Sequence, residues 1–393
     1  MRVGAVSRRS ALAMGAYLTA AAALPASRSL AQEAGGASVP PVAKTKPDGA
    51  LQSAQRQRPL VLGHRGSSAH RPEHTLASYA KAIADGADFI EPDLVSSKDG
   101  VLIARHENNI AETTDVSSHS EFAARKTAKV IDGQRQTGWF TEDFTFAELK
   151  RLRAKERLGA LRPESQSYDG QFQIVSLAEI ADFVGAEAAA RGRTIGLIPE
   201  LKHSTYFASI GLRLEPVFLQ QVAESHQLQT APLIIQSFEV ANLKFLRQKL
   251  SGYANVQLMQ LVGEPDDIAA DIAAAGGKTS WRDMVTPTGL KAIAAYADYL
   301  APNTRAIIAM KADGHLGEPT GLVEAAHRAG LKVGTWTFRP ENAFLAADFR
   351  NGAGDAARNP EGSVAEIRRF LATGIDAFFT DDPYLGRLAV DSI

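Results

Sequence analysis

Short apolar runs and amphipathic segments alternate along the chain between about residue 60 and residue 382. A run of apolar residues bounded by turn formers indicates a buried strand, whereas apolar residues three and four positions apart indicate a helix. Eight runs are predicted as strands: LVLGH (60–64), DFIEPDLV (88–95), TIGLIPELK (194–202), PLIIQSF (232–238), NVQLMQLV (255–262), DYLAPN (298–303), LKVGTWTF (331–338) and IDAFFTDD (375–382). The segments predicted as helices are 75–86, 176–192, 214–228, 239–250, 286–297, 321–330 and 363–374.

This alternation predicts a parallel sheet covered by helices. Eight units over this length favour a TIM-type (β/α)₈ barrel with insertions over an open doubly wound sheet. A Rossmann-like sheet is the alternative, but no strand is followed by a glycine-rich nucleotide-binding turn. The polar stretches 107–170 and 340–362 fit no unit and follow strand ends, after the second strand region and near the seventh strand. We interpret both as insertions at the active-site face.

The first 57 residues differ in composition from the rest of the chain. Residues 1–31 contain the pair Arg8–Arg9, an Ala-rich apolar stretch and small residues before a cleavage point after Ala31. This pattern predicts a Tat-like export signal peptide and a periplasmic or secreted protein. A membrane anchor is the alternative, but the apolar stretch is short for a span of about 20 residues. Residues 32–57 are predicted to be a flexible linker, and 58–393 the barrel domain.

Composition narrows the function. The 393 residues are 45% hydrophobic, which is enough for a large core without disulfides, and the chain contains no cysteine. Thiol catalysis and zinc–thiolate sites are therefore excluded. The formal net charge of −1 provides no basic surface of the kind that binds nucleic acid. A small-molecule substrate is the expected partner, without a stable membrane anchor, and the composition leaves the oligomeric state open.

Three carboxylates occur where predicted strands end. Glu91 and Asp93 lie two positions apart, so their side chains share a face, and Glu200 ends a neighbouring strand candidate. Barrel enzymes collect catalytic groups at the carboxyl ends of their strands. Three acids at one opening would repel one another unless a cation joined them. The pattern predicts a site for one divalent cation with oxygen ligands, either Ca²⁺ or Mg²⁺.

Histidines and cations accompany these acids. His64 and Arg65 end the first strand candidate, and Lys202 ends the third. A turn at Lys98–Asp99 would pair positions whose numbers sum to 197 or 198, which places His106 opposite about Glu91. Two imidazoles beside a metal site suit general acid–base chemistry on a phosphodiester, each with a pKa near neutral. Arg65 and Lys202 would stabilise charge on the phosphoryl oxygens.

The stretch from His64 to His106, HRGSSAHRPEHTLASYAKAIADGADFIEPDLVSSKDGVLIARH, resembles the opening of glycerophosphodiester phosphodiesterases, particularly the exported bacterial branch. The resemblance recurs at PELK (199–202), TWT (335–337) and FFTDDP (378–383). It implies a TIM barrel, a divalent cation and hydrolysis of glycerophosphodiesters to sn-glycerol 3-phosphate and an alcohol. It leaves open whether a glycerol hydroxyl attacks first and gives a cyclic phosphate that water then opens.

The resemblance also implies roles for individual residues. His64 and His106 correspond to the catalytic histidines, Glu91, Asp93 and Glu200 to the metal ligands, Arg65 and Lys202 to phosphate contacts, and Trp336 to a wall beside the glycerol. Two positions depart from the pattern. Pro92 between two metal ligands requires an edge or an irregularity in the strand, and Glu107 stands where an aspartate is common. His70 and His74 are expected in loop or capping roles.

Three other functions are compatible with parts of this pattern. A phospholipase-like phosphodiesterase or lyase on the same fold would act on intact phospholipids. A non-catalytic exported binding protein would not need two proton carriers. A retaining glycosidase would use a carboxylate pair, but would explain neither the histidines nor Arg65.

Overall fold

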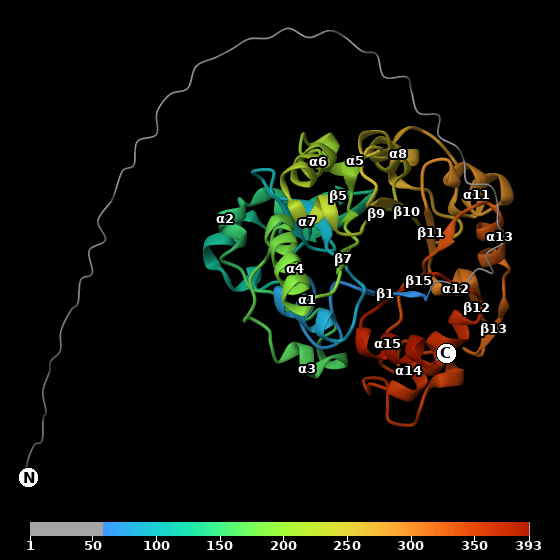
Figure 1. The fold of residues 1–393 in the computed structure, drawn as a ribbon. Helices are drawn as coiled ribbons and strands as arrows, with labels where there is room; N and C mark the ends of the chain where they lie inside the picture. The colour runs from blue at the N-terminus through green and yellow to red at the C-terminus, as the bar shows by residue number, and fades with distance from the viewer. Residues whose placement is uncertain (1–57, 393) are drawn as a thin grey trace, which may run out of the picture. The chain divides into compact units, whose positions relative to one another are not determined.

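The computed structural model describes residues 58–392. The predicted signal peptide (1–31) and linker (32–57) lie outside the described residues. Eight parallel strands pair in the order in which they follow one another along the chain, and helices surround them (Figure 1). These strands are β1 (Leu60–Gly63), β2 (Phe89–Ile90), β7 (Gly196–Leu197), β9 (Leu233–Ser237), β10 (Val256–Val262), β11 (Tyr299–Pro302), β14 (Lys332–Val333) and β15 (Ala377–Thr380).

Backbone hydrogen bonds also connect the two ends of this strand order. The amide of Asp376 donates to the carbonyl of Val333 (2.8 Å), and the amide of Phe379 donates to the carbonyl of Thr335 (2.9 Å). The strands form the ring of a (β/α)₈ barrel, as the alternation predicted. The helices that follow the strands are α1 (Leu76–Ala84), α4 (Leu177–Arg191), α6 (Leu214–Glu224), α8 (Val240–Lys249), α11 (Pro287–Ala294), α13 (Leu322–Arg328), α14 (Pro360–Leu371) and α15 (Pro383–Asp391).

Prolines divide two of the predicted strands. The 88–95 run becomes β2 and β3 (Asp93–Ser96), and the 194–202 run becomes β7 and β8 (Glu200–Leu201). Pro92 and Pro199 have no N–H to donate, so the ladder is interrupted at each of them. The pairing resumes beyond the prolines, where Asp93 aligns with Glu200. The irregularity expected at Pro92 is therefore present, and it brings two acids into register.

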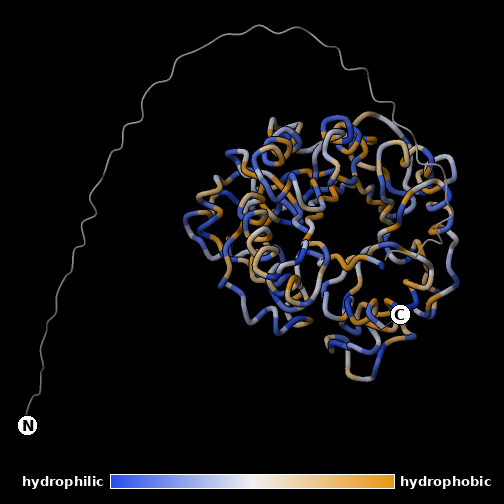
Figure 2. Tube along the Cα trace, in the orientation of Figure 1, coloured by the Kyte–Doolittle hydropathy of each residue, from blue (hydrophilic) through white to orange (hydrophobic). Residues whose placement is uncertain are grey.

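Two hydrophobic clusters stabilise the barrel. Successive residues of β1 point to opposite sides, so Val61 belongs to the large cluster between strands and helices, whereas Leu62 belongs to a smaller cluster with Phe379 and Met259. The smaller cluster fills the interior of the ring. Figure 2 shows hydrophobic residues on the strands and mixed polarity along the outer helices. Among residues 58–392, no helix combines the length and apolarity of a membrane span.

The 107–170 insertion has a structure of its own. Its elements are a hairpin of β5 (Thr127–Ile131) and β6 (Gln134–Gly138), the short helices α2 (Phe146–Leu149) and α3 (Pro163–Gln166), and 3₁₀ turns η1 (Val116–Ser118), η2 (Ser120–Arg125), η3 (Thr141–Asp143) and η4 (Gly159–Leu161). The second insertion contains η5 (Ala347–Phe349) and is shorter than predicted, because α14 begins at Pro360 rather than 363. Asn359 caps this helix and Pro360 is its first residue, which suits proline because that position needs no N–H donor.

Other boundaries also differ from the prediction. The 214–228 helix ends at Glu224, because Ser225 is extended and its hydroxyl caps a new helix, α7 (His226–Thr230). After β11 the chain forms α12 (Thr304–Ile307) and a hairpin of β12 (Ile308–Met310) and β13 (Leu316–Pro319), which the apolar pattern did not predict. The remaining elements are β4 (Leu102–Ala104), α5 (Ser204–Ser209), α9 (Ala270–Ala274) and α10 (Trp281–Met284).

Candidate active site

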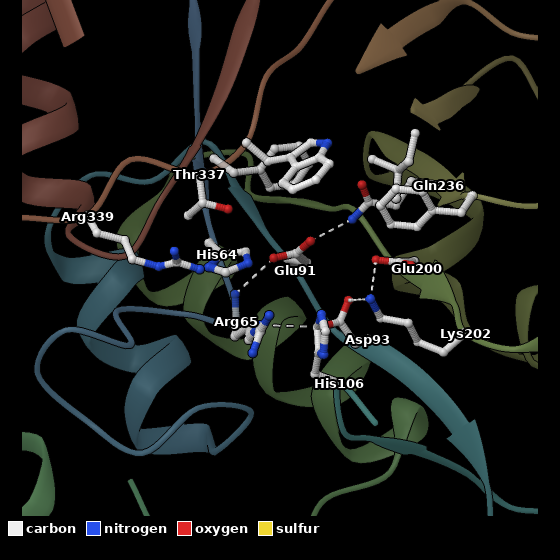
Figure 3. Close-up of a pocket in the computed structure, with 14 residues that line it drawn as sticks. His64, Arg65, Glu91, Asp93, His106, Glu200, Lys202, Gln236, Thr337 and Arg339 are labelled. Carbon is white, nitrogen blue, oxygen red and sulfur yellow. Dashed lines mark hydrogen bonds and ion pairs between the residues drawn. The ribbon is translucent and has the colours of Figure 1, made fainter. Parts of the chain in front are cut away.

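One cavity of about 240 Å³ lies at the carboxyl ends of the barrel strands (Figure 3). All eight residues selected from the sequence line it, although they come from five separate stretches of the chain. They are His64, Arg65, Glu91, Asp93, His106, Glu200, Lys202 and Trp336. The structure thus brings together every predicted site residue, whereas the role of each remains a prediction. Six further residues line the same cavity: Gln236, Phe238, Leu261, Thr337, Arg339 and Phe379.

The three carboxylates form one buried cluster. Glu91, Asp93 and Glu200 each offer an oxygen within 4.8 Å of the others. Burial, followed by repulsion from Asp93 and Glu200, raises the pKa of Glu91 well above its usual range. Burial likewise raises the pKa of Glu200 to about 7, although Lys202 opposes it. Raised pKa values at two neighbouring carboxyls are expected when acids lie this close together without a cation, because their negative charges repel one another.

The oxygens of this cluster also leave room for a ligand. Asp93 Oδ1 is buried without a hydrogen-bond partner among the described residues. A buried oxygen of this kind is costly unless something satisfies it. The donor set consists of carboxylate oxygens only, which suits a hard divalent cation. The residues therefore fit a divalent metal ion.

Neighbouring side chains fix the orientation of each acid. Gln236 Nε2 donates to Glu91 Oε1 (2.7 Å), and the Arg65 amide donates to Glu91 Oε2 (3.0 Å). Lys202 Nζ pairs with Glu200 Oε2 (2.7 Å). The fully buried His74 contacts Asp93 Oδ2 through Nε2 (2.9 Å). Such contacts to ligand carboxylates preorganise a metal site.

His70 and His74 lie in the loop before α1, and neither caps this helix. Thr75 caps α1, through its side chain and the Ser78 amide, whereas His74 bridges Asp93 and the hydroxyl of Tyr79. His70 Nε2 contacts Asp382 Oδ2 (3.2 Å), and its Nδ1 contacts Glu164 of the insertion. His70 therefore connects three loops.

His64 is oriented by a carboxylate that the sequence analysis did not select. Its Nδ1 bonds to Asp381 Oδ1. The backbone explains the contact, since β1 pairs with β15 up to Gly63 and Thr380, and the next residues are His64 and Asp381. Burial lowers the pKa of His64 to about 4 against the opposing effect of Asp381, with Arg65 and Arg339 contributing. The ring is neutral at pH 7, and the bond to Asp381 assigns the proton to Nδ1 and leaves Nε2 as a proton acceptor.

His106 reaches the site through a hairpin, as predicted. β3 and β4 are antiparallel, and Leu94 faces Ala104, so paired numbers sum to 198. The extended register places His106 opposite Pro92, one of the two alternatives given by the turn. Its Nδ1 bonds to Glu107 Oε1. Burial, together with Arg65 and Lys202, lowers the pKa of His106 to about 3.

The expectation of two imidazoles that titrate near neutral pH is therefore not met. Both rings are buried beside cations, and both effects disfavour the imidazolium form. A sequence does not report burial or the number of cations around a side chain. Each ring is a neutral base in the free protein.

Three cations and an aromatic wall complete the cavity. Arg65, Lys202 and Arg339 line it, which provides positive charge for an anionic group. Trp336 donates Nε1–H to the carbonyl of Ala301 (2.9 Å) and packs edge to face against Phe238. A second, larger groove of about 900 Å³ shares His106, Lys202 and Trp336 with the first cavity. The cavity and the groove therefore adjoin at these residues.

Several residues of the site were not selected from the sequence, and four of them show the physical reasons. Asp381 was visible at the end of the last strand candidate, and barrel closure puts that strand beside the first. Gln236 likewise ends a strand candidate, but uncharged side chains gave no signal. Arg157 and Arg162 lie in the insertion, where no periodic pattern places a residue over the barrel.

The fold and the site together define a barrel protein with a cationic cavity and an acidic cluster that could hold a metal ion. The sequence profile of the glycerophosphoryl diester phosphodiesterase family matches residues 64–385. The chain therefore belongs to this family of enzymes.

Individual relatives agree with the family match. The chain is 34% identical over 341 residues to glycerophosphodiester phosphodiesterase GDPD6 of Arabidopsis thaliana, covering 83% of this chain and 84% of the plant protein. It is 24% identical over 336 residues to a glycerophosphodiester phosphodiesterase of Haemophilus influenzae, covering 81% of this chain and 89% of that protein. These relatives include a plant protein, and membership of the exported bacterial branch stays a prediction.

Solved structures share the fold. A structure from Silicibacter pomeroyi, assigned as a glycerophosphoryl diester phosphodiesterase, has a TM-score of 0.60 at 20% identity, covering 86% of this chain and 94% of that one. An Oleispira antarctica phosphodiesterase in complex with the product sn-glycerol-3-phosphate has a TM-score of 0.55 at 19% identity, covering 85% of this chain and 97% of that one.

Proposed function

We propose that this protein hydrolyses glycerophosphodiesters to sn-glycerol 3-phosphate and an alcohol, with one divalent cation and two histidines. The observation that carries the proposal is the single cavity in which a buried acidic cluster, three cations and two neutral imidazoles meet. The names of the relatives and the product bound to the Oleispira protein support the choice of substrate.

Glu91, Asp93 and Glu200 would hold the cation, as Ca²⁺ or Mg²⁺. When bound, the cation offsets the charge of these acids and stabilises negative charge on the phosphoryl oxygens. Arg65 and Lys202, which line the cavity with the acids, would bind the phosphate, and Arg339 adds positive charge near His64. Trp336 and Phe238 provide an apolar face for the carbon atoms of the glycerol.

The two imidazoles divide the proton transfers. His64 is neutral, so its Nε2 accepts the proton of the attacking group, either water or the glycerol hydroxyl of the substrate, as the oxygen of that group bonds to phosphorus. Asp381 stabilises the imidazolium that results. If the glycerol hydroxyl attacks, water then opens the cyclic phosphate. His106 lines both the cavity and the larger groove, so it lies where the alcohol would leave. The negative phosphate that enters beside His106 favours its protonated form, because this charge opposes the effect of Arg65 and Lys202. His106 then donates its proton to the departing alkoxide.

A panel of glycerophosphodiesters assayed after chelation, and again with Ca²⁺ or Mg²⁺ restored, tests the proposal. We expect activity to disappear on chelation and to return with a divalent cation. Activity that survives thorough removal of metal would refute the proposed requirement for a divalent cation. Parallel assays on glycerophosphocholine and on intact phospholipid distinguish this reaction from a phospholipase-like one. Cleavage of the lipid alone would refute the proposed substrate.

We also propose that the protein is exported, with residues 1–31 as a Tat-like signal peptide and 32–57 as a linker to the barrel domain. The twin arginines and the small residues before the cleavage point support this. Amino-terminal sequencing of the protein recovered from periplasm or medium should begin at Gln32. A product that retains Met1 would contradict export by this route.

A further inference from the structure

The segment 155–162 of the insertion, KERLGALR, carries two arginines that contact carboxylates of the active site, Arg157 at Glu107 and Arg162 at Asp381. We propose that Arg157 and Arg162 are positioning residues for the reaction, each holding the carboxylate that orients one of the two histidines. The inference rests on the proposed function of His64 and His106. It makes the 107–170 insertion a part of the catalytic apparatus.

Arg162 holds the carboxylate behind His64. Asp381 gives one oxygen, Oδ1, to His64 Nδ1, and its other oxygen, Oδ2, accepts from Arg162. The side chain of Arg162 is 4% exposed, and that of Asp381 is 2% exposed. Arg339 Nε also donates to Oδ2 (3.2 Å), so both oxygens are engaged, and the carboxylate and the imidazole bonded to it are held in one orientation.

The other nitrogens of Arg162 connect two further loops. Arg162 Nε donates to Glu341 Oε1 (2.7 Å) in the second insertion. Its Nη1 donates to the carbonyl of Ser68 (3.0 Å), and the hydroxyl of Ser68 donates to the carbonyl of His64 (3.0 Å). One guanidinium therefore joins the loops after β1, β14 and β15 around His64. The three contacts use three separate nitrogens of the planar guanidinium, whereas a lysine donates from a single nitrogen and could not span the same acceptors.

Arg157 holds the carboxylate behind His106 in the same way. Glu107 bonds to His106 Nδ1 through Oε1, and Arg157 donates to both oxygens, Oε1 (3.0 Å) and Oε2 (2.6 Å). Arg157 also donates to Glu73 Oε1 (2.7 Å), whose other oxygen accepts from Arg65 (3.1 Å). Arg157 thus reaches both the second histidine and a phosphate-binding arginine.

The repetition of this arrangement argues for function. Two imidazoles from different parts of the barrel each have a carboxylate at Nδ1, and each carboxylate accepts hydrogen bonds from an arginine of the insertion. Both arginines lie within eight residues of one insertion. Simple packing of a loop on a barrel requires no such match. Because a histidine must present Nε2 within hydrogen-bond reach of its proton, small rotations of either ring would slow the reaction.

Steady-state kinetics of Arg162→Lys and Arg157→Lys test the proposal in the full-length, metal-loaded enzyme. Lysine preserves the charge but not the multiple hydrogen bonds, so the fold is disturbed least. We expect kcat on a glycerophosphodiester to fall about 10–100-fold in each variant, with KM within about threefold of wild type, as for other residues behind a catalytic group.

Arg125→Lys is the matched control. Arg125 lies in the same insertion and forms a two-bond pair with Glu148, through Nη1 (3.0 Å) and Nη2 (2.6 Å), but Glu148 contacts no histidine. Its kcat should equal that of wild type. The Nδ1–H resonance of His64 in proton NMR should shift in Arg162→Lys and stay unchanged in Arg125→Lys. If all three variants turn over like wild type, the two arginines have no positioning role.

A double-mutant cycle keeps the proposal testable if Arg162→Lys loses stability. If Arg162 acts through Asp381, its substitution should have little further effect on kcat in an Asp381→Asn background. Additive losses would overturn the inference. His64→Ala separates the two levels of the argument: wild-type turnover there would refute the proposed function, and the inference with it. An inactive His64→Ala beside a fully active Arg162→Lys would refute the inference alone.

Discussion

The surroundings of His64 and of His106 have the same chemical components but are built differently. The partner of His64, Asp381, lies 317 positions away in the chain, whereas the partner of His106 is the next residue, Glu107. The His64 side chain is 11% exposed and that of His106 is 31% exposed. The first arrangement depends on the pairing of the first and last strands, and the second on a local hairpin. The barrel must therefore be complete before His64 can work, while His106 requires mainly its own hairpin and the insertion.

Removal of either imidazole tests whether both sides contribute to the reaction. His64→Ala and His106→Ala should each lower kcat by about 10²–10⁴-fold, because general acid–base groups contribute effects of this size. Turnover of a glycerophosphodiester by both variants, beside wild type, is the measurement. If one variant keeps wild-type turnover, the corresponding histidine has no part in proton transfer, and the comparison between the two sides fails.

Neutralising Asp381, the partner of His64, should lower the activity more than neutralising Glu107, the partner of His106. Asp381→Asn replaces a buried carboxylate that accepts a hydrogen bond from Arg162, so we expect kcat to fall about 100-fold. The side chain of Glu107 is more exposed, and Glu107→Gln should lower kcat about tenfold. Asp381→Asn should also lower the melting temperature more, because it removes one of the two buried carboxylates that pair with Arg162. Kinetics and thermal unfolding of both variants check this. Equal losses of kcat and of melting temperature in the two variants would contradict the inference that the more buried acid, Asp381, contributes more.

The pH dependence of stability should reveal the buried state of His64. Burial is the main cause of its lowered pKa of about 4, so the unfolded chain, with a pKa near 6.5, binds more protons in between. The free energy of unfolding should consequently decrease as pH falls from about 6.5 to 4, by up to about 1.4 kcal/mol per pH unit from this group. Denaturant unfolding in the presence of chelator measures it. His64→Gln should have a shallower slope than wild type, and an unchanged slope would place His64 in a more solvated environment.

The smallest effect on kcat is expected at Glu107, which stands where an aspartate is common in the family. Glu107→Asp shortens the side chain that connects His106 to Arg157, which weakens rather than removes a hydrogen bond. A loss of about threefold in kcat would correspond to part of one hydrogen bond. Asp381→Glu, which lengthens the buried acid, provides the comparison and should cost more because that site has no space to adapt. A larger loss in Glu107→Asp than in Asp381→Glu would reverse our view of which side is rigid.

Much of the fold was predictable because it depends on local patterns. The eight strand candidates correspond to the eight strands of the ring, and their alternation with helices predicted the parallel topology. The hairpin at Lys98–Asp99 could be placed from its turn residues, which set the register that carries His106 to the site. The hairpin of β12 and β13 was missed because its strands have only three and four residues and form a separate small sheet outside the alternation of the ring.

The site was predictable mainly where a charged residue at the end of a predicted strand also belongs to a recognisable motif. Glu91, Asp93, Glu200 and Lys202 satisfy this condition, and the structure brings them to one cavity. Arg157 and Arg162 do not, because they lie on an insertion whose path over the barrel depends on contacts with three loops. The lowered pKa values of the histidines were also beyond prediction, since burial and nearby cations belong to the assembled site.

The sequence by itself determined the family, the order of strands and helices, and the residue types that meet at the strand ends. Hydrophobic periodicity and short motifs act over a few residues, and these can be interpreted without coordinates. The tertiary structure alone decided that Asp381 lies behind His64, that one insertion holds both histidine-orienting acids, and that both imidazoles are neutral. Each of these depends on distances between residues far apart in the chain and on the water that folding removes from around them.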